Sequence, residues 1–156
     1  MMASMRQFIR LVVILLTISV SLPAVAAPSQ RQFLGRWLIA GAHPAPWSVP
    51  GDAPSSPFDA RIVGKAIVYE RTRITGPRLL ACRHPDYQLQ QVPPEGLFQG
   101  GLTAPAPQAT ALGFRGDTIL TLQTGCAGGI DFHFVNQSTA LFALDNMVYT
   151  IRKQRE

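Results

Sequence analysis

The chain has 156 residues, of which 47% are hydrophobic and 15% charged, and its formal net charge is +5. This length suits one domain with an apolar core, and the mild charge excludes the strongly basic footprint of a nucleic-acid-binding protein. We therefore expect no nucleic-acid partner.

The first 26 residues are typical of a secretory signal peptide. Two arginines precede the apolar run Leu11–Val20, and the small residues Ala24-Val25-Ala26 follow. The run is shorter than the roughly 20 residues of a membrane-spanning helix, so a transmembrane anchor is the less favoured interpretation. We expect cleavage after Ala26, a periplasmic or secreted domain of residues 27–156 with a net charge of +3 (twelve basic and nine acidic residues), and no stable membrane anchor.

Short apolar runs separated by glycine and proline predict strands through most of the chain. One short helix is expected near Gln108–Leu112, with Pro107 at its first position and Gly113 ending it. The expected strands are Leu34–Ala40, Arg61–Tyr69, Arg73–Gly76, Tyr87–Val92, Thr118–Leu122, Ile130–Val135, Thr139–Leu144 and Met147–Arg152. The pattern predicts an all-β fold, a small antiparallel β-barrel of about eight strands.

A proline-rich loop, residues 43–57, separates the first two expected strands. Loops of this length in small domains are often functional. Trp47 lies in its middle and has two interpretations. It folds back as a plug over one end of the barrel, or it contacts a partner, since aromatic residues dominate binding energetics.

Basic residues gather between the second and fourth expected strands. The simplest interpretation is a solvated strand face balanced by acidic neighbours, and the alternative is a patch that binds a carboxylate or phosphate. Two of these arginines, Arg71 and Arg73, lie near a turn, where they are candidates for the rim of a binding surface shared with Trp47. The group consists of Arg61, Lys65, Arg71, Arg73, Arg78 and Arg83.

The chain has two cysteines, Cys82 and Cys126, 44 positions apart. In an oxidising compartment an even pair predicts one disulfide, which for a loop of this length stabilises the fold by about 4 kcal/mol. A redox pair or metal thiolates are the alternatives, but there is no C-x-x-C spacing to favour them.

The C-terminal third predicts a three-stranded meander. Asp145-Asn146 suits a two-residue hairpin turn, and Asn136-Gln137-Ser138 suits a three-residue turn before it. This register gives one face that is apolar throughout, and a slip by one residue would destroy it. The residues of that face are Ile130, Phe132, Phe134, Ala140, Phe142, Leu144, Met147, Tyr149 and Ile151.

The opposite face of the meander is mixed in composition and is expected to face solvent. It carries Asp131 and His133, which we interpret as a surface pair. The alternative is a base with its orienting carboxylate, or two metal ligands, completed by Glu95 or His84. The nearby Leu97 and Phe98 are interpreted as core anchors of a long crossing. We expect no catalytic residues, metal or cofactor.

Phe33-Leu-Gly-Arg-Trp37 resembles the opening G-x-W strand of lipocalin-like and META-like envelope domains. The stretch from Val68 to Cys82 is similar to the META pattern of a strand, a turn, a glycine and then a cysteine, and the segment 144–151 resembles its closing strand. Arg83 stands where the META pattern often has asparagine. The resemblance implies a small secreted bacterial β-domain and assigns no functional residue.

Two functions follow as hypotheses. The first is a monomeric, non-catalytic binding module of the bacterial envelope, an inhibitor or an envelope-stress accessory protein, whose partner is a periplasmic protein or a small ligand. The second is a small hydrolase or metal-dependent enzyme that uses Asp131 and His133. The first is favoured because no nucleophile and base are assembled in the sequence.

Overall fold

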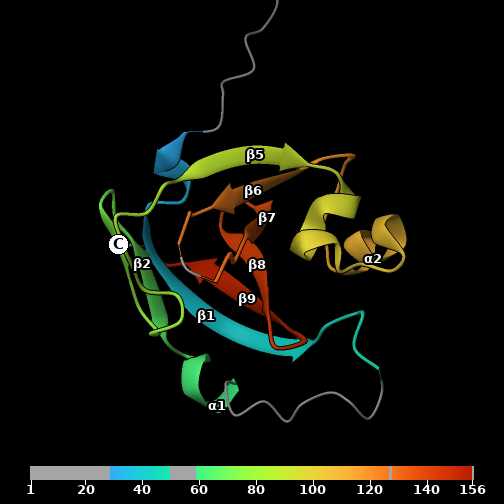
Figure 1. The fold of residues 1–156 in the computed structure, drawn as a ribbon, viewed down its shortest axis with the longest axis horizontal. Coiled ribbons are helices and arrows are strands. Elements are labelled where there is room, and N and C mark those ends of the chain that lie inside the picture. Colours follow the sequence, from blue (N-terminus) through green and yellow to red (C-terminus); the bar gives the residue numbers. More distant parts are fainter. Residues whose placement is uncertain (1–28, 50–58, 127, 156) are drawn as a thin grey trace, which may run out of the picture.

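The computed structural model describes residues 29–49, 59–126 and 128–155. The expected signal peptide and part of the proline-rich loop lie outside these ranges. Within them, nine antiparallel strands form one curled sheet, a half-barrel, with two short α-helices (Figure 1). The prediction of a small antiparallel all-β fold with a short helix is confirmed.

The elements include two short α-helices and two 3₁₀ turns besides the nine strands. The helices are α1 (Asp59–Ile62) and α2 (Pro105–Ala111), with 3₁₀ turns η1 (Gln30–Gln32) and η2 (Pro94–Gly100). The strands are β1 (Gly35–Pro44), β2 (Ala66–Tyr69), β3 (Arg73–Thr75), β4 (Cys82–Arg83), β5 (Gln88–Val92), β6 (Ile119–Gln123), β7 (Phe132–Asn136), β8 (Thr139–Leu144) and β9 (Met147–Lys153).

The strand order is β4-β3-β2-β1-β9-β8-β7-β6-β5. An N-terminal group of four strands therefore meets a C-terminal group of five at one junction, the pairing of β1 with β9. That pairing runs from Trp37 opposite Lys153 to Pro44 opposite Met147, with an irregularity between Ile39 and Gly41. It joins segments more than 100 residues apart in the sequence.

A disulfide connects the two halves a second time. Cys82 lies in the edge strand β4, and Cys126 follows β6 near the other edge; their Cα atoms are 5.9 Å apart. The hydroxyl of Tyr87 also donates a hydrogen bond to the carbonyl of Glu70, at 2.7 Å. The predicted disulfide is confirmed, and it holds the curl of the sheet closed.

The C-terminal meander has the predicted register. Leu144 pairs with Met147 and Phe142 with Tyr149 across the Asp145-Asn146 turn, whose two residues have positive φ. The preceding turn differs from the prediction, because Asn136 pairs directly with Thr139 and an irregularity follows Phe134. The turn therefore has two residues instead of the predicted three. The third residue is accommodated in β7 as a β-bulge between Phe134 and Asn136.

The predicted apolar face forms the main core, on the inside of the curl. Trp37 is fully buried there, and its indole Nε1–H donates to the carbonyl of Phe33 at 2.8 Å. Phe142 and Tyr149 stack with ring centroids 4.9 Å apart. The buried members include Phe33, Trp37, Ile39, Ile67, Tyr69, Leu122, Phe132, Phe134, Ala140, Phe142, Met147, Tyr149 and Ile151.

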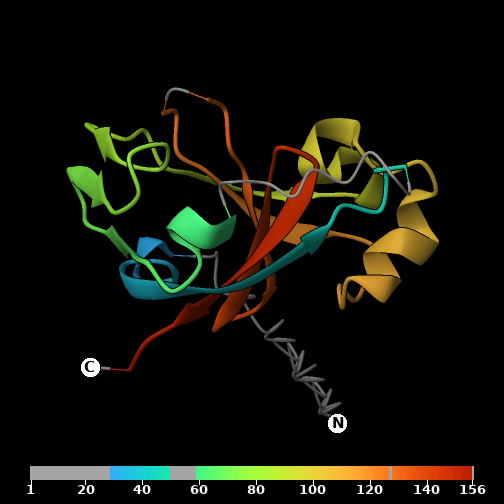
Figure 2. The ribbon, with the colours of Figure 1, turned by 90° about the horizontal axis from the view of Figure 1, so that it is seen from below.

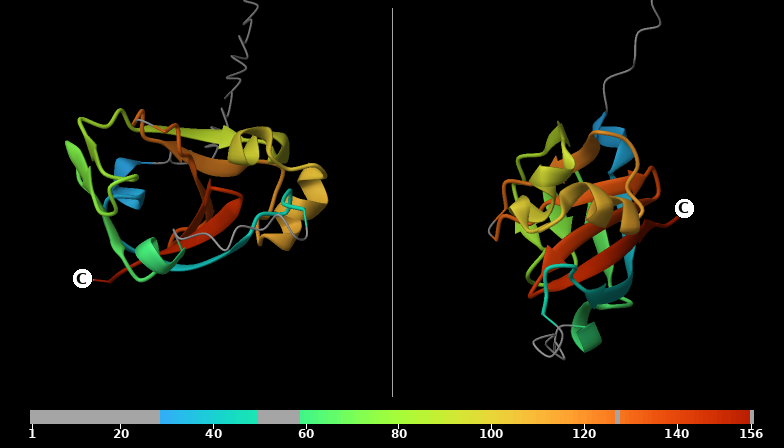
Figure 3. Two further views of the ribbon diagram at one scale, coloured as in Figure 1. Left: turned by 60° about the horizontal axis from the view of Figure 1, so that its bottom comes forward. Right: turned by 90° about the vertical axis from the view of Figure 1, so that its right-hand side faces the viewer.

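The opposite face of the meander is buried at His133, Leu141 and Val148, so the prediction that it faces solvent is wrong there, whereas Arg152 is exposed. Figures 1 and 3 show α2 and η2 covering β7, β8 and β9 on the side away from β2. Leu97 and Phe98 of η2 are core anchors, as predicted. This second core consists of Ala45, Leu97, Phe98, Leu102, Ala109, Phe114, Ile119, Leu141 and Val148.

Other boundaries also differ from the sequence prediction. Strand β1 extends to Pro44 rather than ending at Ala40. The expected strand Arg61–Tyr69 is divided: α1 occupies its start, Gly64 turns the chain with φ +80°, and the strand begins at Ala66. The helix α2 begins at Pro105 rather than at Pro107, because proline fits the first turn of a helix wherever it stands.

We expect the double substitution Cys82→Ala with Cys126→Ala to lower the free energy of unfolding by about 4 kcal/mol, because the open chain gains the entropy of a 44-residue loop. Urea denaturation followed by fluorescence measures the loss. The wild-type protein with a reducing agent is the control and should match the variant. A difference below about 0.5 kcal/mol would show that the disulfide does not hold the sheet closed.

Candidate functional site

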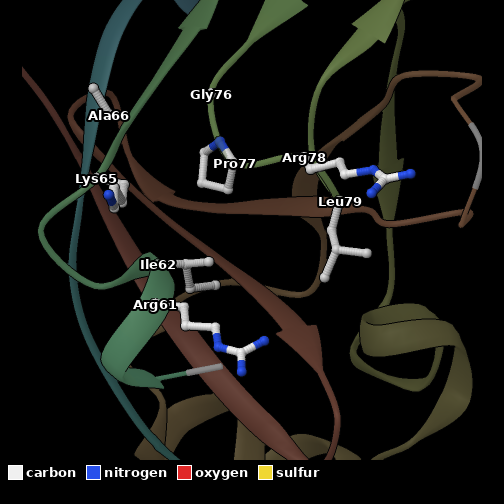
Figure 4. Close-up of a pocket in the computed structure, with 8 residues that line it drawn as sticks. All are labelled: Arg61, Ile62, Lys65, Ala66, Gly76, Pro77, Arg78 and Leu79. Carbon is white, nitrogen blue, oxygen red and sulfur yellow. The ribbon is translucent and has the colours of Figure 1, made fainter. Parts of the chain in front are cut away.

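A cleft of about 790 Å³ lies between α1 and the loop that connects β3 with β4 (Figure 4). Four other concave regions of the described residues hold between about 120 and 600 Å³. Its wall on one side is α1 with the start of β2, and on the other side the Gly76–Leu79 loop. The lining residues are Arg61, Ile62, Lys65, Ala66, Gly76, Pro77, Arg78 and Leu79.

Backbone hydrogen bonds fix the α1 wall on strand β1. The amide of Gly64 donates to the carbonyl of Ile39 at 2.8 Å, and the amide of Ile39 donates to the carbonyl of Lys65 at 2.9 Å. Ile62 at the end of α1 is buried in the main core. The wall is therefore positioned by β1, the strand at the junction of the two sheet halves.

The opposite wall depends on Gly76. Its φ is +150°, and a Cβ atom at this position would lie 2.8 Å from the carbonyl oxygen of Ala66. Glycine alone allows the loop to approach β2 so closely. The amides of Leu80 and Ala81 then both donate to the carbonyl of Pro77, at 2.8 and 3.0 Å, which makes a tight turn and leaves Arg78 and Leu79 at the rim.

Three cationic side chains surround an apolar lining. Arg61, Lys65 and Arg78 are exposed, and none of the eight described lining residues has a carboxylate. Among the described residues these three make no ion pair with an acidic side chain, in contrast to Arg73, which pairs with Glu70. Aliphatic carbon of Ile62, Pro77 and Leu79 lies between them (Figure 4).

This arrangement suits binding rather than proton transfer. Guanidinium groups bind carboxylate or phosphate oxygens with two parallel hydrogen bonds and stay charged at all physiological pH values. The lining contains no histidine, carboxylate, cysteine or hydroxyl, so apart from the Lys65 amine these eight residues supply no general base or nucleophile. The cleft can hold a molecule that has an anionic group and a hydrocarbon part.

The predicted basic group is divided into two by the fold. Arg61, Lys65 and Arg78 surround the cleft, whereas Arg71 and Arg73 lie exposed at the turn between β2 and β3. The hydrogen bond from Arg73 lowers the pKa of the Glu70 carboxyl and raises the pKa of Arg73. Arg83 stands directly opposite Arg73 in the β3–β4 pair.

Trp47 packs at the edge of the second core. It is half-buried, its indole Nε1–H donates to Asn146 Oδ1 at 3.2 Å, and its ring centroid lies 5.4 Å from that of Phe98. Pairing places the β2–β3 turn beside Gly35, at the start of β1, whereas Trp47 follows the end of that strand. Trp47 and the Arg71–Arg73 turn therefore do not share one rim.

His133 is fully buried, so its interpretation as a surface residue is wrong. Its Nε2 accepts a hydrogen bond from the amide of Phe98 at 2.9 Å, and its Nδ1 lies 2.8 Å from Thr121 Oγ1. Acceptance at Nε2 places the proton of the neutral ring on Nδ1. Burial lowers the pKa of His133 to about 4. The imidazole ties η2 to the sheet.

Asp131 is half-buried and interacts with the Gln123 amide at 3.5 Å rather than with His133. Burial raises the pKa of its carboxyl, and the hydrogen bond from Gln123 lowers it by less. Asp131 lines a polar groove of about 350 Å³ beside Cys126. The other residues that line this groove include Asp86, Gln88, Gln99 and Gln123.

The residues proposed to complete a site with Asp131 and His133 do not join them. Glu95 and His84 are exposed, and among the residues with described positions no three acidic, histidine or cysteine side chains are grouped to hold a metal.

Comparison with protein-family models, with curated proteins and with solved structures gave no match. In the part of the chain that the structure describes, none of the helices has the length and apolar character needed to cross a bilayer.

The cations of the cleft were predictable from the sequence, but the cleft was not. Arg61 and Lys65 were expected within one continuous strand, so the short helix α1, which forms one wall of the cleft, was not predicted. The sequence signal that was missed is Gly76-Pro77, which ends β3 and turns the next two residues back toward β2.

Stability should depend on pH through His133. Its pKa in the folded protein is below the ordinary value of 6.5, so the contribution is complete above pH 6.5 and is lost as the pH falls toward 4. The total loss is about 3 kcal/mol. We expect the stability difference between wild type and His133→Gln, measured by urea denaturation, to shrink by about this amount between pH 7 and pH 4.

Asp131 is present in both proteins of this comparison, so its own titration cancels from the difference. A stability difference that stays constant from pH 7 to pH 4 would contradict the buried, neutral imidazole.

Trp47→Ala should lower the free energy of unfolding by about 1–2 kcal/mol, because a half-buried ring and one hydrogen bond are lost. Phe132→Ala removes a buried ring from the main core and should lower it by about 3–5 kcal/mol. Thermal and urea denaturation of both variants test this ranking. Equal losses would show that Trp47 is as much a core residue as Phe132.

Proposed function

We propose that this protein is a non-catalytic binding module that holds an amphiphilic anion, a carboxylate or phosphate with a hydrocarbon part, in the cleft between α1 and the β3–β4 loop. The ligand's anionic group contacts Arg61, Lys65 and Arg78. Its apolar part lies against Ile62 and Leu79.

One observation carries this proposal: three cations without an acidic partner among the described residues stand around one apolar cleft. Like charges held close together repel one another, and an anion between them removes that repulsion. The cations lie on separate elements, α1, the α1–β2 connection and the β3–β4 loop. Each element is fixed by its own backbone hydrogen bonds, so little backbone conformational entropy is lost when the ligand binds.

The proposed place of action is the periplasm or the cell exterior. The expected signal peptide and the disulfide support it, because disulfides persist in oxidising compartments. We extend the proposal to an accessory or inhibitory role in the bacterial envelope, carried out as a monomer. That the protein is related to META-like and lipocalin-like envelope domains stays a prediction.

The alternative hypothesis, an enzyme that uses Asp131 and His133, has less support. Both ring nitrogens of His133 are engaged with Phe98 and Thr121 inside the second core. Asp131 interacts with Gln123 instead. The binding roles predicted for Trp47 and for the Arg71–Arg73 turn also stay predictions, and the experiment below includes one of these residues.

We expect dodecyl phosphate, below its micelle concentration, to bind with 1:1 stoichiometry in isothermal titration calorimetry. Arg78→Ala and Arg61→Ala should each weaken binding by about tenfold, because each removes one charge-assisted contact. Arg71→Ala is the matched control, an exposed arginine in the β2–β3 turn, beside the start of β1 and outside the cleft lining. No binding at millimolar ligand, or an equal effect of Arg71→Ala, would reject the cleft as the site.

A further inference from the structure

Large hydrophobic side chains are exposed at only three described positions, and two of them adjoin the cleft. Val63 is 37% exposed and directly follows the last residue of α1, and Leu79 is 46% exposed on the opposite wall. The third, Val49, is 61% exposed and lies two residues after Trp47, whose ring packs against Phe98 of η2. The end of β1, which leads to this segment, points toward α2 and away from α1 (Figure 2).

Single exposed aliphatic residues are ordinary on protein surfaces. Here they coincide with the cations Arg61, Lys65 and Arg78, none of which has an acidic partner among the described residues. In Figure 4 the Leu79 side chain lies between the guanidinium groups of Arg61 and Arg78. Aliphatic tips set among long basic side chains are the combination with which proteins dock on an anionic bilayer: the apolar groups enter the interface and the cations contact lipid phosphates.

We propose that the face formed by α1, its connection to β2 and the β3–β4 loop docks on an anionic lipid membrane. One acyl chain enters the cleft, the phosphate of its headgroup lies between Arg61 and Arg78, and Val63 and Leu79 enter the boundary between headgroups and acyl chains. This inference rests on the proposed function, since it identifies the amphiphilic anion as a membrane lipid.

The chemistry of the lining favours a lipid over an acidic peptide. The cleft is lined by three cations and by aliphatic residues and glycine, and none of its eight described lining residues is Ser, Thr, Asn, Gln or Tyr. A peptide that entered the cleft would leave its backbone amides without an acceptor among the lining side chains, each at a free-energy cost. An acyl chain has no backbone amides or carbonyls. A single phosphate group can form charge-assisted hydrogen bonds with the three cations.

The position of the face in the fold agrees with docking on a flat surface. α1 and the β3–β4 loop lie on the side of the sheet away from α2 and η2, which cover the second core (Figures 1 and 3). Both α1 and the β3–β4 loop are anchored in the main core, α1 by the buried side chain of Ile62 and the loop by that of Leu80. Docking there leaves both cores and the disulfide in place.

Cosedimentation with vesicles tests the inference. The full secreted protein is mixed with equimolar phosphatidylglycerol–phosphatidylcholine vesicles and, in parallel, with phosphatidylcholine vesicles. We expect binding to the anionic vesicles alone, weakened as the salt concentration rises from about 0.05 M to about 0.5 M. Each of Arg61→Ala, Lys65→Ala and Arg78→Ala should lower the partition coefficient by about fivefold.

The aliphatic contribution has its own variant and a matched control. Val63→Gln removes an apolar tip without adding charge, and because Val63 does not line the cleft, dodecyl phosphate should still bind within about twofold. Its vesicle partition should fall by about fivefold. Val49→Gln makes the same change on the far side of the molecule and should leave the partition unchanged.

Four outcomes would overturn the membrane inference. If dodecyl phosphate binds but the vesicles do not, the cleft binds an anion and the proposed function stands without a membrane. If vesicle binding is reduced equally by Val63→Gln and Val49→Gln, the docking face is wrong. If an acidic peptide such as hexaglutamate displaces the protein from vesicles at a lower concentration than dodecyl phosphate does, the ligand is a peptide. If vesicles bind and dodecyl phosphate does not, both proposals fail, since no lipid then occupies the cleft.

Discussion

The two halves of the sheet meet at one junction, the antiparallel pairing of β1 with β9. Four strands that precede residue 84 lie on one side of it and five later strands on the other. Trp37 of β1 is buried beneath this junction, and the Lys153 ammonium of β9 lies 5.7 Å from the centroid of its ring. The disulfide then joins the same two halves at their outer parts. The β1–β9 pairing and the disulfide thus connect the two halves of the half-barrel at opposite positions. The main core lies inside this curl and depends on both connections.

The proposed site depends on the same junction. Ile39 of β1 exchanges backbone hydrogen bonds with the α1–β2 connection, so the Arg61–Lys65 wall of the cleft is built directly on the central strand. The facing loop is held close by Gly76, and Cys82, only six positions later, is covalently attached to the far half of the sheet. Cations on separate elements are thus fixed at one cleft, with the outer layer of α2 and η2 left free to cover the second core.

Local features of the fold were predictable from the sequence, and long-range ones were not. The meander register followed from alternation and from the Asp145-Asn146 turn, because side-chain period and turn chemistry are local properties. The pairing of the cysteines followed from their number and from the expected oxidising compartment. The β1–β9 junction joins segments over 100 positions apart, and no local pattern specifies it. His133 was misplaced because burial of its face comes from η2 and α2; apolar Leu141 and Val148 on that face were the available signal. At the site, the cations were predictable as a group, but their division into two sets required the three-dimensional pairing.

The most direct test of this account is to map the ligand by NMR. Amide chemical shifts of the ¹⁵N-labelled protein are followed while dodecyl phosphate is added. The account predicts that the largest changes lie in residues 61–66 and 76–79, on the two walls of the cleft, with the amides of the polar groove beside Cys126 and those around Trp47 unchanged. Changes centred on the groove or on Trp47 would contradict the central claim that the cationic cleft is the binding site.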